Sequence, residues 1–328
     1  MSGRPIIAAV GAGRMGRGIA HAFAYGGHEV RLIDAKPRPA ADFEALRKDA
    51  LAEVEGSLRM MARLGQFGDN DVPRLLARVS VHSADKLGPA LEGVHFIFEG
   101  VPETREAKAE AFARIDAVAE PDAILASTTS TFLSSLLAGL TRRPGRFLNA
   151  HWLNPAFLVP LVEVSPHEGT DPDALAAVMA LLEGIGKKPV QCRASPGYIV
   201  PRIQALAMNE AARLVEEGVA TAEDVDTAVL YGFGFRFAVL GLIEFIDWGG
   251  GDILHYASAY LAEAMEDERF RAPAIVGENM RAGRIGMKTG AGFYDWAARD
   301  VDAHRRERLG GFLAMLRQIG AVRPPVLD

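Results

Sequence analysis

The sequence GAGRMG at residues 11–16 constrains the fold of this chain more than any other short segment. It follows the apolar run at residues 6–10, which is typical of a buried strand. It leads into residues 15–25, whose small and apolar residues predict a helix. A glycine-rich turn between a strand and a helix indicates a βαβ unit, which belongs to a parallel sheet covered by helices. The chain is therefore expected to begin with an α/β domain.

The alternation of short apolar runs with longer helical segments continues over the first two-thirds of the chain. It predicts further strands at residues 29–33, 94–98, 123–127, 147–151, 158–164 and 188–191. It predicts helices at residues 40–64, 105–119, 131–140 and 174–185. This order favours a Rossmann-type fold, a doubly wound parallel sheet with helices on both faces.

The strand pattern fades from Ser195 onward, where apolar spacing typical of helices replaces it. Helices are predicted at residues 199–217, 222–230, 253–266 and 271–282. The Ser-Pro-Gly sequence at residues 195–197 interrupts both patterns, and 328 residues exceed the usual single-domain range. We therefore expect an α/β domain at residues 1–194 followed by an all-α domain at residues 195–328.

The glycine turn has the context of a dinucleotide site, because Asp34 ends the strand that follows its helix. Gly11 permits the tight turn, Gly13 lets the backbone approach a pyrophosphate, and Gly16 allows the helix to pack closely on the strand. The free N–H groups at the helix N-terminus favour bound phosphate. The predicted cofactor contacts at this end are Gly11, Gly13, Met15, Gly16 and Asp34.

Asp34 also indicates which dinucleotide binds. A carboxylate at this position accepts hydrogen bonds from the ribose hydroxyls and repels a 2′-phosphate, which favours NAD over NADP. Lys36 and Arg38 lie nearby and soften that preference. The sequence therefore predicts NAD as the cofactor of residues 1–194.

The composition of the chain limits which other ligands and partners are expected. A formal net charge of −6 argues against nucleic acid or an anionic membrane as the main ligand. Cys192 is the one cysteine, so no intrachain disulfide forms and a reducing cytoplasm fits. The apolar runs are too short for a signal peptide or for a membrane span of about 20 residues. We expect a cytoplasmic protein that acts on a small molecule and has no metal site.

Polar side chains follow two of the predicted strands at the edge where ligands bind in such sheets. Glu103 follows the strand at residues 94–98, and either contacts the cofactor or supports a helix N-terminus with its charge. The hydroxyl run at residues 127–130 follows the next strand, where it caps a helix or presents one hydroxyl to the site.

A titratable pair lies in the apolar stretch AHWLNPAFLVPLVEV at residues 150–164. His151 ends a predicted strand, and Glu163 lies in a strand that can return beside it. An isolated histidine in such a setting is most often a satisfied core residue. Here its place at a strand end, with Asn154 and Glu163 close by, favours a general base oriented by a carboxylate.

The chain resembles the L-3-hydroxyacyl-CoA dehydrogenase superfamily over essentially its whole length. The matching segments are VGAGRMGRGIA, EGVPETREAK, ASTTSTF, HWLNPAFLVPLVEV, SPGYIVPRI, MNEAARLVEEGVATAEDVD and KTGAGFYDW. The resemblance implies a Rossmann domain followed by a helical domain that forms a homodimer. It also implies residue roles: His151 as catalytic base, Glu163 as its partner, Ser130 as the substrate-binding serine, and Glu103 and Lys108 near the cofactor.

The reaction implied by the resemblance is the reversible oxidation of a secondary alcohol. His151 removes the hydroxyl proton while hydride moves to the nicotinamide, Ser130 hydrogen-bonds the oxygen, and Glu163 steadies the imidazolium. A short-chain substrate such as 3-hydroxybutyryl-CoA is the first hypothesis, and its place would be in fatty acid metabolism.

Two positions depart from the family pattern on the substrate side. Pro201 replaces an asparagine that normally contacts substrate, and proline offers no side-chain donor. Leu64 replaces the lysine that meets the CoA phosphates in typical members, although Arg59 and Arg63 remain close. Because of these two departures, the sequence does not decide whether the substrate is a CoA thioester.

Arg236, in the apolar and aromatic run YGFGFRFAVLG, raises an alternative. If buried, it needs an anionic partner, either Glu244 or Asp247 within the chain or the carboxylate of a free hydroxy acid. L-gulonate and carnitine dehydrogenases have a similar segment, so the second hypothesis is a dehydrogenase of a free 3-hydroxy acid. Asn154 and Arg236 are the further predicted substrate contacts.

Two further classes are less well supported. A non-catalytic NAD-binding protein of lens-crystallin type would have no need to retain Ser130, His151 and Glu163 together. The β-hydroxyacid dehydrogenases related to 6-phosphogluconate dehydrogenase share the glycine turn but rely on a catalytic lysine, whereas this chain matches the histidine type. The sequence does not fix chain length, reaction direction or the size of the oligomer.

Overall fold

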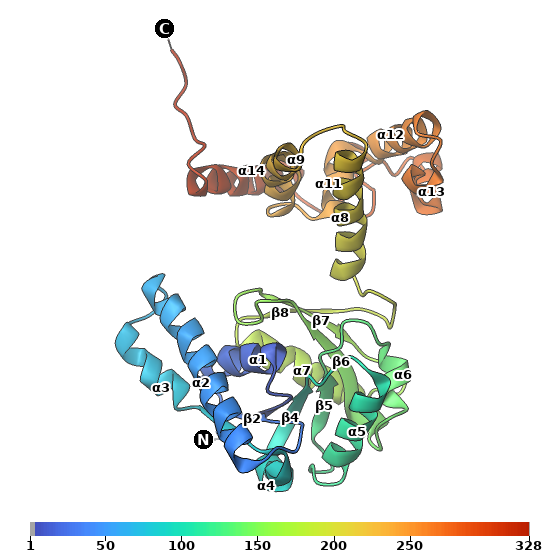
Figure 1. The fold of residues 1–328 in the computed structure, drawn as a ribbon. Helices are drawn as coiled ribbons and strands as arrows, with labels where there is room; N and C mark the ends of the chain where they lie inside the picture. The colour runs from blue at the N-terminus through green and yellow to red at the C-terminus, as the bar shows by residue number, and fades with distance from the viewer. Residues whose placement is uncertain (1–3, 328) are drawn as a thin grey trace. The chain divides into compact units, whose positions relative to one another are not determined.

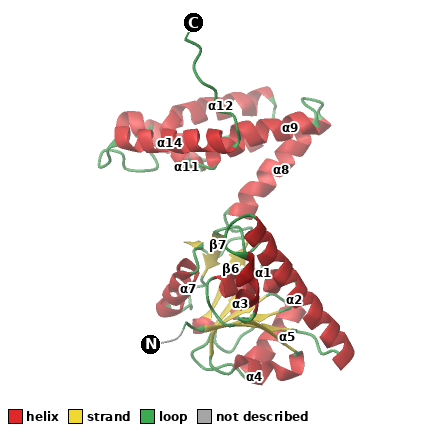
Figure 2. Cartoon of the chain, turned by 90° about the vertical axis from the view of Figure 1, so that its left-hand side faces the viewer, coloured by secondary structure: helices red, strands yellow, loops and turns green. Residues whose placement is uncertain are grey.

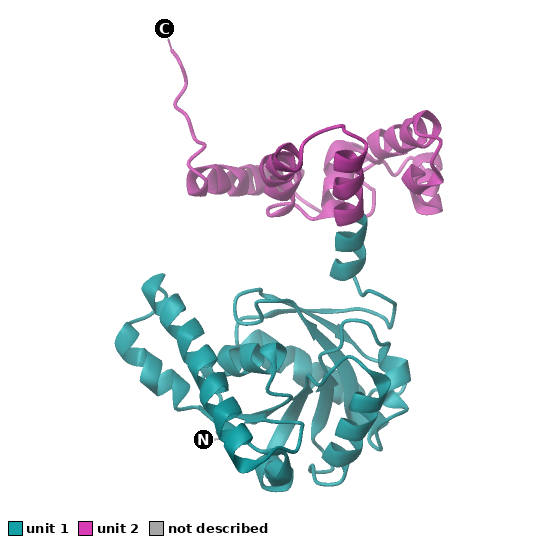
Figure 3. Ribbon diagram, in the orientation of Figure 1, with its two compact units in different colours: residues 1–206 teal, residues 207–328 magenta. Residues whose placement is uncertain are grey.

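The computed structural model describes residues 4–327, and the chain divides into two compact units (Figure 3). The first runs to Leu206 and the second begins at Ala207. The division falls inside helix α8 (Val200–Glu216), shortly after the boundary expected at residues 194–195. Each unit is described by itself below.

The first unit is built on an eight-stranded sheet with the order β3-β2-β1-β4-β5-β6-β7-β8 (Figure 1). β6 and β7 pair antiparallel, and every other neighbouring pair in the described sheet is parallel. The strands are β1 (Ile6–Val10), β2 (Val30–Ile33), β3 (Val79–His82), β4 (Val94–Glu99), β5 (Ile124–Ser127), β6 (Phe147–Trp152), β7 (Leu161–Ser165) and β8 (Lys188–Gln191). The predicted Rossmann-type sheet is confirmed.

Seven of these strands match predicted ones, and β3 was missed. Its sequence, Val-Ser-Val-His, has only two apolar residues, and it pairs as the edge strand beside β2. The predicted strand at residues 158–164 begins three residues later, at Leu161.

Helices cover both faces of the sheet (Figure 2). They are α1 (Arg14–Tyr25), α2 (Ala40–Arg63), α3 (Val72–Leu76), α4 (Leu87–Leu91), α5 (Arg105–Asp116), α6 (Ser134–Ala138) and α7 (Pro172–Gly184). One buried cluster joins the sheet to α1, α2 and α7 through Ile19, Phe23, Leu58 and Leu182, and another joins it to α4, α5 and α6 through Leu91, Phe112 and Leu137.

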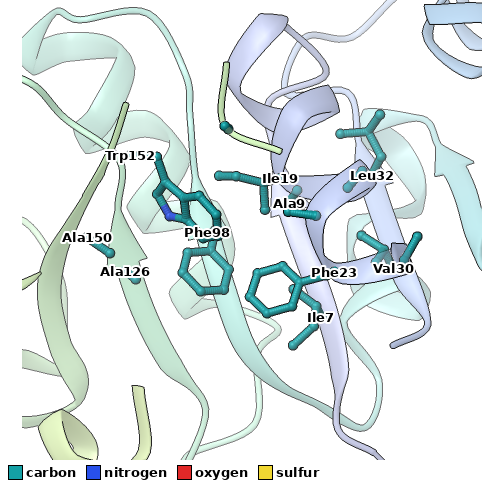
Figure 4. Close-up of a cluster of buried hydrophobic side chains, with 14 of the residues drawn as sticks. Ile7, Ala9, Ile19, Phe23, Val30, Leu32, Phe98, Ala126, Ala150 and Trp152 are labelled. Atoms are coloured by element: carbon teal, nitrogen blue, oxygen red, sulfur yellow. The ribbon is translucent and has the colours of Figure 1, made fainter. Parts of the chain in front are cut away.

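The first cluster is anchored by three aromatic rings on three elements. Phe23 of α1 lies 5.2 Å from Phe98 of β4, and Phe98 lies 5.9 Å from Trp152 of β6, measured between ring centroids (Figure 4). All three side chains are fully buried. Burying each ring is worth roughly 1.5–3 kcal/mol, so this packing fixes α1 against the strands that carry the site.

Helices make up most of the second unit. They are α9 (Ala222–Ala228), a π-helical turn at Val229–Gly234, α10 (Phe235–Phe237), α11 (Leu242–Gly249), α12 (Gly251–Ala264), α13 (Ala274–Arg281) and α14 (Val301–Gln318). The predicted all-α character is confirmed, but α11 and α14 were missed. Glycines end α11, and the first half of α14 is strongly charged, so neither has the pattern of a core helix.

The C-terminal motif KTGAGFYDW has a folding role in the second unit. Asp247, 2% exposed at the end of α11, accepts hydrogen bonds from the backbone N–H of Phe293 and Tyr294 and from the indole of Trp296, at 2.8–3.0 Å. A Cβ at Gly292 would lie 2.2 Å from an Asp247 oxygen, so the turn requires glycine there. The motif is therefore a loop that satisfies one buried carboxylate.

No single helix in residues 4–327 is long and apolar enough to cross a membrane, although the bent pair Ala222–Phe237 and Leu242–Gly249 meets the length and composition test together. In the same residues no cluster of histidine, cysteine and acidic side chains is arranged to hold a metal ion.

Candidate active site

The three glycines of the turn after β1 are needed for three different structural reasons. Gly11 adopts φ +117°, and a Cβ there would lie 2.5 Å from the carbonyl oxygen of Gly100. A Cβ on Gly16 would lie 1.9 Å from the Gly11 carbonyl oxygen, so helix α1 can approach β1 only with glycine here. Gly13 faces open space, since no described atom outside Gly13 and its chain neighbours lies within 4 Å of its Cβ position. Open space beside the first N–H groups of a helix suits a pyrophosphate.

Two other predicted cofactor residues flank this turn. Met15 is half-buried in the first turn of α1 and packs against the core of the sheet. Asp34, 4% exposed at the end of β2, lines a pocket with Val10, Lys36, Val101 and Arg114. An acidic side chain therefore borders a pocket beside the glycine turn.

The Asp34 carboxylate is already paired with a cationic side chain. Its Oδ2 accepts a hydrogen bond from Arg38 at 2.6 Å, and its Oδ1 accepts one from the backbone N–H of Lys36 at 3.2 Å. Arg38 is exposed, so its guanidinium is available to move. The two cationic residues singled out in the sequence therefore lie beside this carboxylate.

Ser130 lies in a loop that Glu103 organises. One Glu103 oxygen, Oε1, accepts hydrogen bonds from the Thr129 hydroxyl, from the backbone N–H of Ser130 and Thr131 at 3.0 Å, and from the Thr131 hydroxyl at 2.8 Å. The other oxygen lies 3.2 Å from the Lys108 ammonium. Burial alone would raise the pKa of Glu103, but the Thr129 hydrogen bond and Lys108 hold it below its usual value. Glu103 therefore supports the loop that presents Ser130.

This loop corrects the helix predicted at residues 131–140. The helix α6 spans only Ser134–Ala138, because the N–H groups of Thr131 and Phe132 donate to Glu103 and Thr129 instead of entering a helix. Ser130 itself is exposed at the end of β5.

His151 and Glu163 form a buried pair. They face each other in the antiparallel register of β6 and β7, and His151 Nδ1 lies 2.8 Å from Glu163 Oε2. His151 is 6% exposed and Glu163 is fully buried. The other Glu163 oxygen accepts from the backbone N–H of Ile199 and Val200, both at 2.8 Å, where helix α8 begins.

This hydrogen bonding fixes the tautomer of the imidazole. Two N–H donors on one Glu163 oxygen favour the ionised carboxylate, whose other oxygen can then only accept. His151 Nδ1 must therefore carry the hydrogen, which leaves Nε2 with a free lone pair. An imidazole held in this way can take a proton at Nε2.

Comparison with known proteins identifies the family. Residues 6–195 match the NAD binding domain of 3-hydroxyacyl-CoA dehydrogenase, and residues 197–296 match the C-terminal domain of the same family. The chain belongs to the 3-hydroxyacyl-CoA dehydrogenase family. It is an NAD-dependent oxidoreductase of that type, with NAD as its cofactor, as the sequence predicted.

Several relatives match nearly the whole length of this chain. The chain is 32% identical to 5-formyl-3-hydroxy-2-methylpyridine 4-carboxylate 5-dehydrogenase of Mesorhizobium japonicum, covering 95% of this chain and 97% of that protein. It is 32% identical to a probable 3-hydroxybutyryl-CoA dehydrogenase of Bacillus subtilis, covering 88% and 96%. Among solved structures, a 3-hydroxyacyl-CoA dehydrogenase of Archaeoglobus fulgidus matches with a TM-score of 0.75 at 30% identity, covering 97% and 100%.

The structure contains a buried ion pair, between Glu99 and Lys108, that the sequence did not predict. Glu99 ends β4 with no exposed surface, and both its oxygens lie 3.1 Å from the ammonium of Lys108, which is 1% exposed on α5. Glu99 also accepts from the Ser127 hydroxyl at 2.6 Å and from the Val101 N–H at 2.7 Å. It therefore ties together β4, β5 and α5. The direct cofactor contact expected of Lys108 stays a prediction.

Lys108→Met is expected to lower the free energy of unfolding by about 3 kcal/mol, because it leaves Glu99 buried without its cation. Urea denaturation of the purified protein measures the change. The matched control is Lys48→Met on the exposed face of α2, which should change stability by less than about 0.5 kcal/mol. Equal stability of the Lys108 variant and the wild type would contradict this account of the pair.

Arg236 does not occupy a buried site that would require an anionic partner. Arg236 is exposed, and its guanidinium lies over the Phe245 ring at 5.3 Å. Neither predicted internal partner pairs with it: Glu244 binds His304 and Arg308, and Asp247 is occupied by the C-terminal motif. The aromatic neighbours Phe233, Phe235 and Phe237 are themselves exposed or only partly buried, so an apolar run in the sequence does not bury Arg236 here. A contact with a substrate carboxylate stays a prediction.

Asn154 follows β6 and borders a second pocket of the first unit, together with Arg14, Arg17, Ser57 and Phe157. It is exposed, and it lies three residues from His151. The structure thus places Asp34, His151 and Asn154 at or just after the carboxyl ends of β2 and β6. Lys108 lies instead on α5, and Glu163 lies in the middle of the antiparallel strand β7.

Proposed function

We propose that this chain oxidises the 3-hydroxyl of a short-chain L-3-hydroxyacyl-CoA, of the 3-hydroxybutyryl-CoA type, to the 3-keto compound. The observation that carries the proposal is the His151–Glu163 pair, whose free Nε2 lies at the sheet edge that also carries Ser130 and the glycine turn. A base, a hydroxyl donor and a dinucleotide turn at one edge suit the removal of a proton and a hydride from a secondary alcohol.

The residues act in a simple sequence. His151 accepts the hydroxyl proton at Nε2, while Ser130 hydrogen-bonds the same oxygen as it becomes a ketone. Glu163 stabilises the imidazolium through its contact with Nδ1. NAD, when bound, supplies the hydride acceptor. General-base catalysis of this kind contributes about 10²–10⁴-fold in rate, and the remaining acceleration comes from positioning.

A free 3-hydroxy acid, of the L-gulonate or carnitine type, is the second candidate substrate. Near the second pocket Arg17 is already paired with Asp49 and Glu53, and farther along α2 Arg59 is paired with Glu55 and Asp69. Leu64, where typical members have a lysine, is 67% exposed. CoA phosphates need unpaired cations or N–H donors, so the pairing of Arg17 and Arg59 with carboxylates favours a substrate without phosphates. Among the described residues, Arg14 of the second pocket and Arg63 have no carboxylate partner and remain available to a phosphate.

A substrate panel separates the two candidates. The purified chain is incubated with NAD and either L-3-hydroxybutyryl-CoA, free L-3-hydroxybutyrate, L-gulonate or L-carnitine, and NADH absorbance is followed. Turnover of the thioester at least about 100-fold above the free acids supports the first candidate. The reverse preference supports the second, and no turnover of any 3-hydroxy compound contradicts both.

Asp34→Ala is expected to shift the cofactor preference toward NADP by at least about tenfold. The substitution removes the charge that repels a 2′-phosphate and releases Arg38 to bind it. The ratio of kcat/KM for NAD and NADP measures the change. Asp42→Ala, an exposed residue at the start of α2, is the control that leaves the ratio unchanged. An unchanged ratio in the Asp34 variant would refute the assignment of Asp34 to the ribose.

We further infer that the protein is a cytoplasmic homodimer that pairs through residues 195–328. Several large apolar side chains of these residues are more than 60% exposed: Leu206, Met208, Leu230, Tyr231, Ile253, Tyr256 and Tyr260. Soluble monomers rarely expose so much apolar surface, and a second copy of the chain would cover it. Light scattering after gel filtration tests the dimer, and a monomer at micromolar concentration would refute it.

A further inference from the structure

Tyr198 occupies an unusual position in the segment that leads into helix α8. It follows the Ser-Pro-Gly sequence and adopts φ +46°, in the left-handed region that non-glycine residues rarely occupy. Its side chain is only 6% exposed. A bulky residue keeps such a conformation only when its surroundings hold it there, and these positions concentrate at functional sites.

The ring of Tyr198 stacks on the imidazole of His151. The two ring centroids lie 4.8 Å apart, and the ring planes differ by 13°. The tyrosine thus covers one face of the imidazole, while Glu163 holds Nδ1 from the edge. The stacked ring and the Glu163 hydrogen bond together restrict the tilt and the rotation of the imidazole.

The hydroxyl of Tyr198 reaches the loop that carries Ser130. It donates to the carbonyl oxygen of Thr129 at 2.9 Å and accepts from the side-chain amide of Asn149 at 3.0 Å. Burial raises the pKa of Tyr198, so the hydroxyl keeps its proton and remains a donor. The Thr129 carbonyl belongs to the peptide bond whose N–H is that of Ser130. The hydroxyl therefore fixes that peptide on the side opposite to Glu103.

We propose that Tyr198 is a positioning residue that fixes His151 and Ser130 relative to each other. Its ring sets the plane of the base, and its hydroxyl sets the peptide of the serine that binds the reacting oxygen. The inference rests on the proposed function, because it assigns His151 and Ser130 the roles given there. The adjacent N–H groups of Ile199 and Val200 hold Glu163, so one short segment orients all three residues.

The tyrosine hydroxyl can be removed without removing the ring. Tyr198→Phe keeps the stacking and the volume but leaves the Thr129 carbonyl and one N–H of Asn149 without a partner. We expect kcat/KM for the hydroxy substrate to fall about tenfold, with the dissociation constant of NAD unchanged within about twofold. Tyr25→Phe, a half-exposed tyrosine of α1, is the matched control and should retain full activity.

A double-mutant cycle separates positioning from general support of the fold. If Tyr198 acts through the Ser130 peptide, Tyr198→Phe should change kcat/KM by less than about twofold when Ser130 is already alanine. Full activity of Tyr198→Phe, an equal loss in both backgrounds, or a parallel loss of NAD binding would each overturn the proposal.

A spectroscopic measurement tests the proposal without any substrate. In ¹⁵N-labelled protein, the amide signal of Ser130 should shift in Tyr198→Phe, while the imidazole signals of His151 should shift only in Tyr198→Leu, which lacks the ring. An unmoved Ser130 signal, or unmoved His151 signals in Tyr198→Leu, would overturn the proposal. A wild-type chain that oxidises none of the panel substrates would refute the proposed function instead, and the two failures are thus distinguishable.

Discussion

His151→Ala is expected to lower kcat for the hydroxy substrate by about 10³-fold, within the range of 10²–10⁴-fold that a general base contributes. The substitution removes the imidazole that accepts the hydroxyl proton in the proposed reaction. NAD binding should stay within about twofold, because the glycine turn and Asp34 lie on other strands. Stopped-flow measurement of NADH formation, together with a fluorescence titration of NAD, checks both parts.

The matched control is His95→Ala. His95 is exposed on β4, and its removal should leave kcat unchanged within about twofold. A His151 variant that retains more than about a tenth of the wild-type kcat would contradict the assignment of the base. Loss of NAD binding in the same variant would instead indicate that the imidazole supports the fold of the first unit.

Much of the first unit was predictable because its signals are local. The glycine turn, the strand before it and the helix after it lie within twenty residues, and steric contacts at Gly11 and Gly16 enforce that arrangement. The His151–Glu163 pair was predictable for a similar reason. Only eleven residues separate the two, and the short connection returns the chain as an antiparallel neighbour.

The parts of the site that escaped prediction depend on contacts between distant segments. Tyr198 and Thr129 are hydrogen-bonded although they lie 69 residues apart in the sequence, and Ser127 and Glu99 although they lie 28 apart. No spacing rule links such residues, because the packing of strands and loops decides which of them touch. Glu99 gave one weak signal, a carboxylate at the end of an apolar strand. Arg236 shows the converse, since an apolar neighbourhood in sequence did not make it buried.

Glu163→Gln is the second substitution with a large expected effect, about a 10³-fold loss of kcat with the fold retained. All three groups around Glu163 are N–H donors: the backbone of Ile199 and Val200 on one oxygen and His151 Nδ1 on the other. A carboxylate can accept all three hydrogen bonds, whereas an amide has one oxygen and one NH₂. The glutamine side chain must therefore turn one of its two ends toward the wrong partner.

The lower-cost orientation places the amide oxygen on the two backbone donors and the NH₂ on the imidazole, because only one N–H group then needs to change. His151 Nδ1 becomes an acceptor, its hydrogen moves to Nε2, and the base no longer has a lone pair for the substrate proton. In serine proteases the same exchange of an orienting carboxylate for its amide costs about 10⁴-fold. Glu163→Ala instead leaves buried donors unsatisfied, at about 1–3 kcal/mol each, so this variant should lose stability as well as activity. Thermal denaturation and NADH formation distinguish the two variants. A Glu163→Gln protein with full activity would show that the carboxylate supports helix α8 alone and has no part in orienting the base.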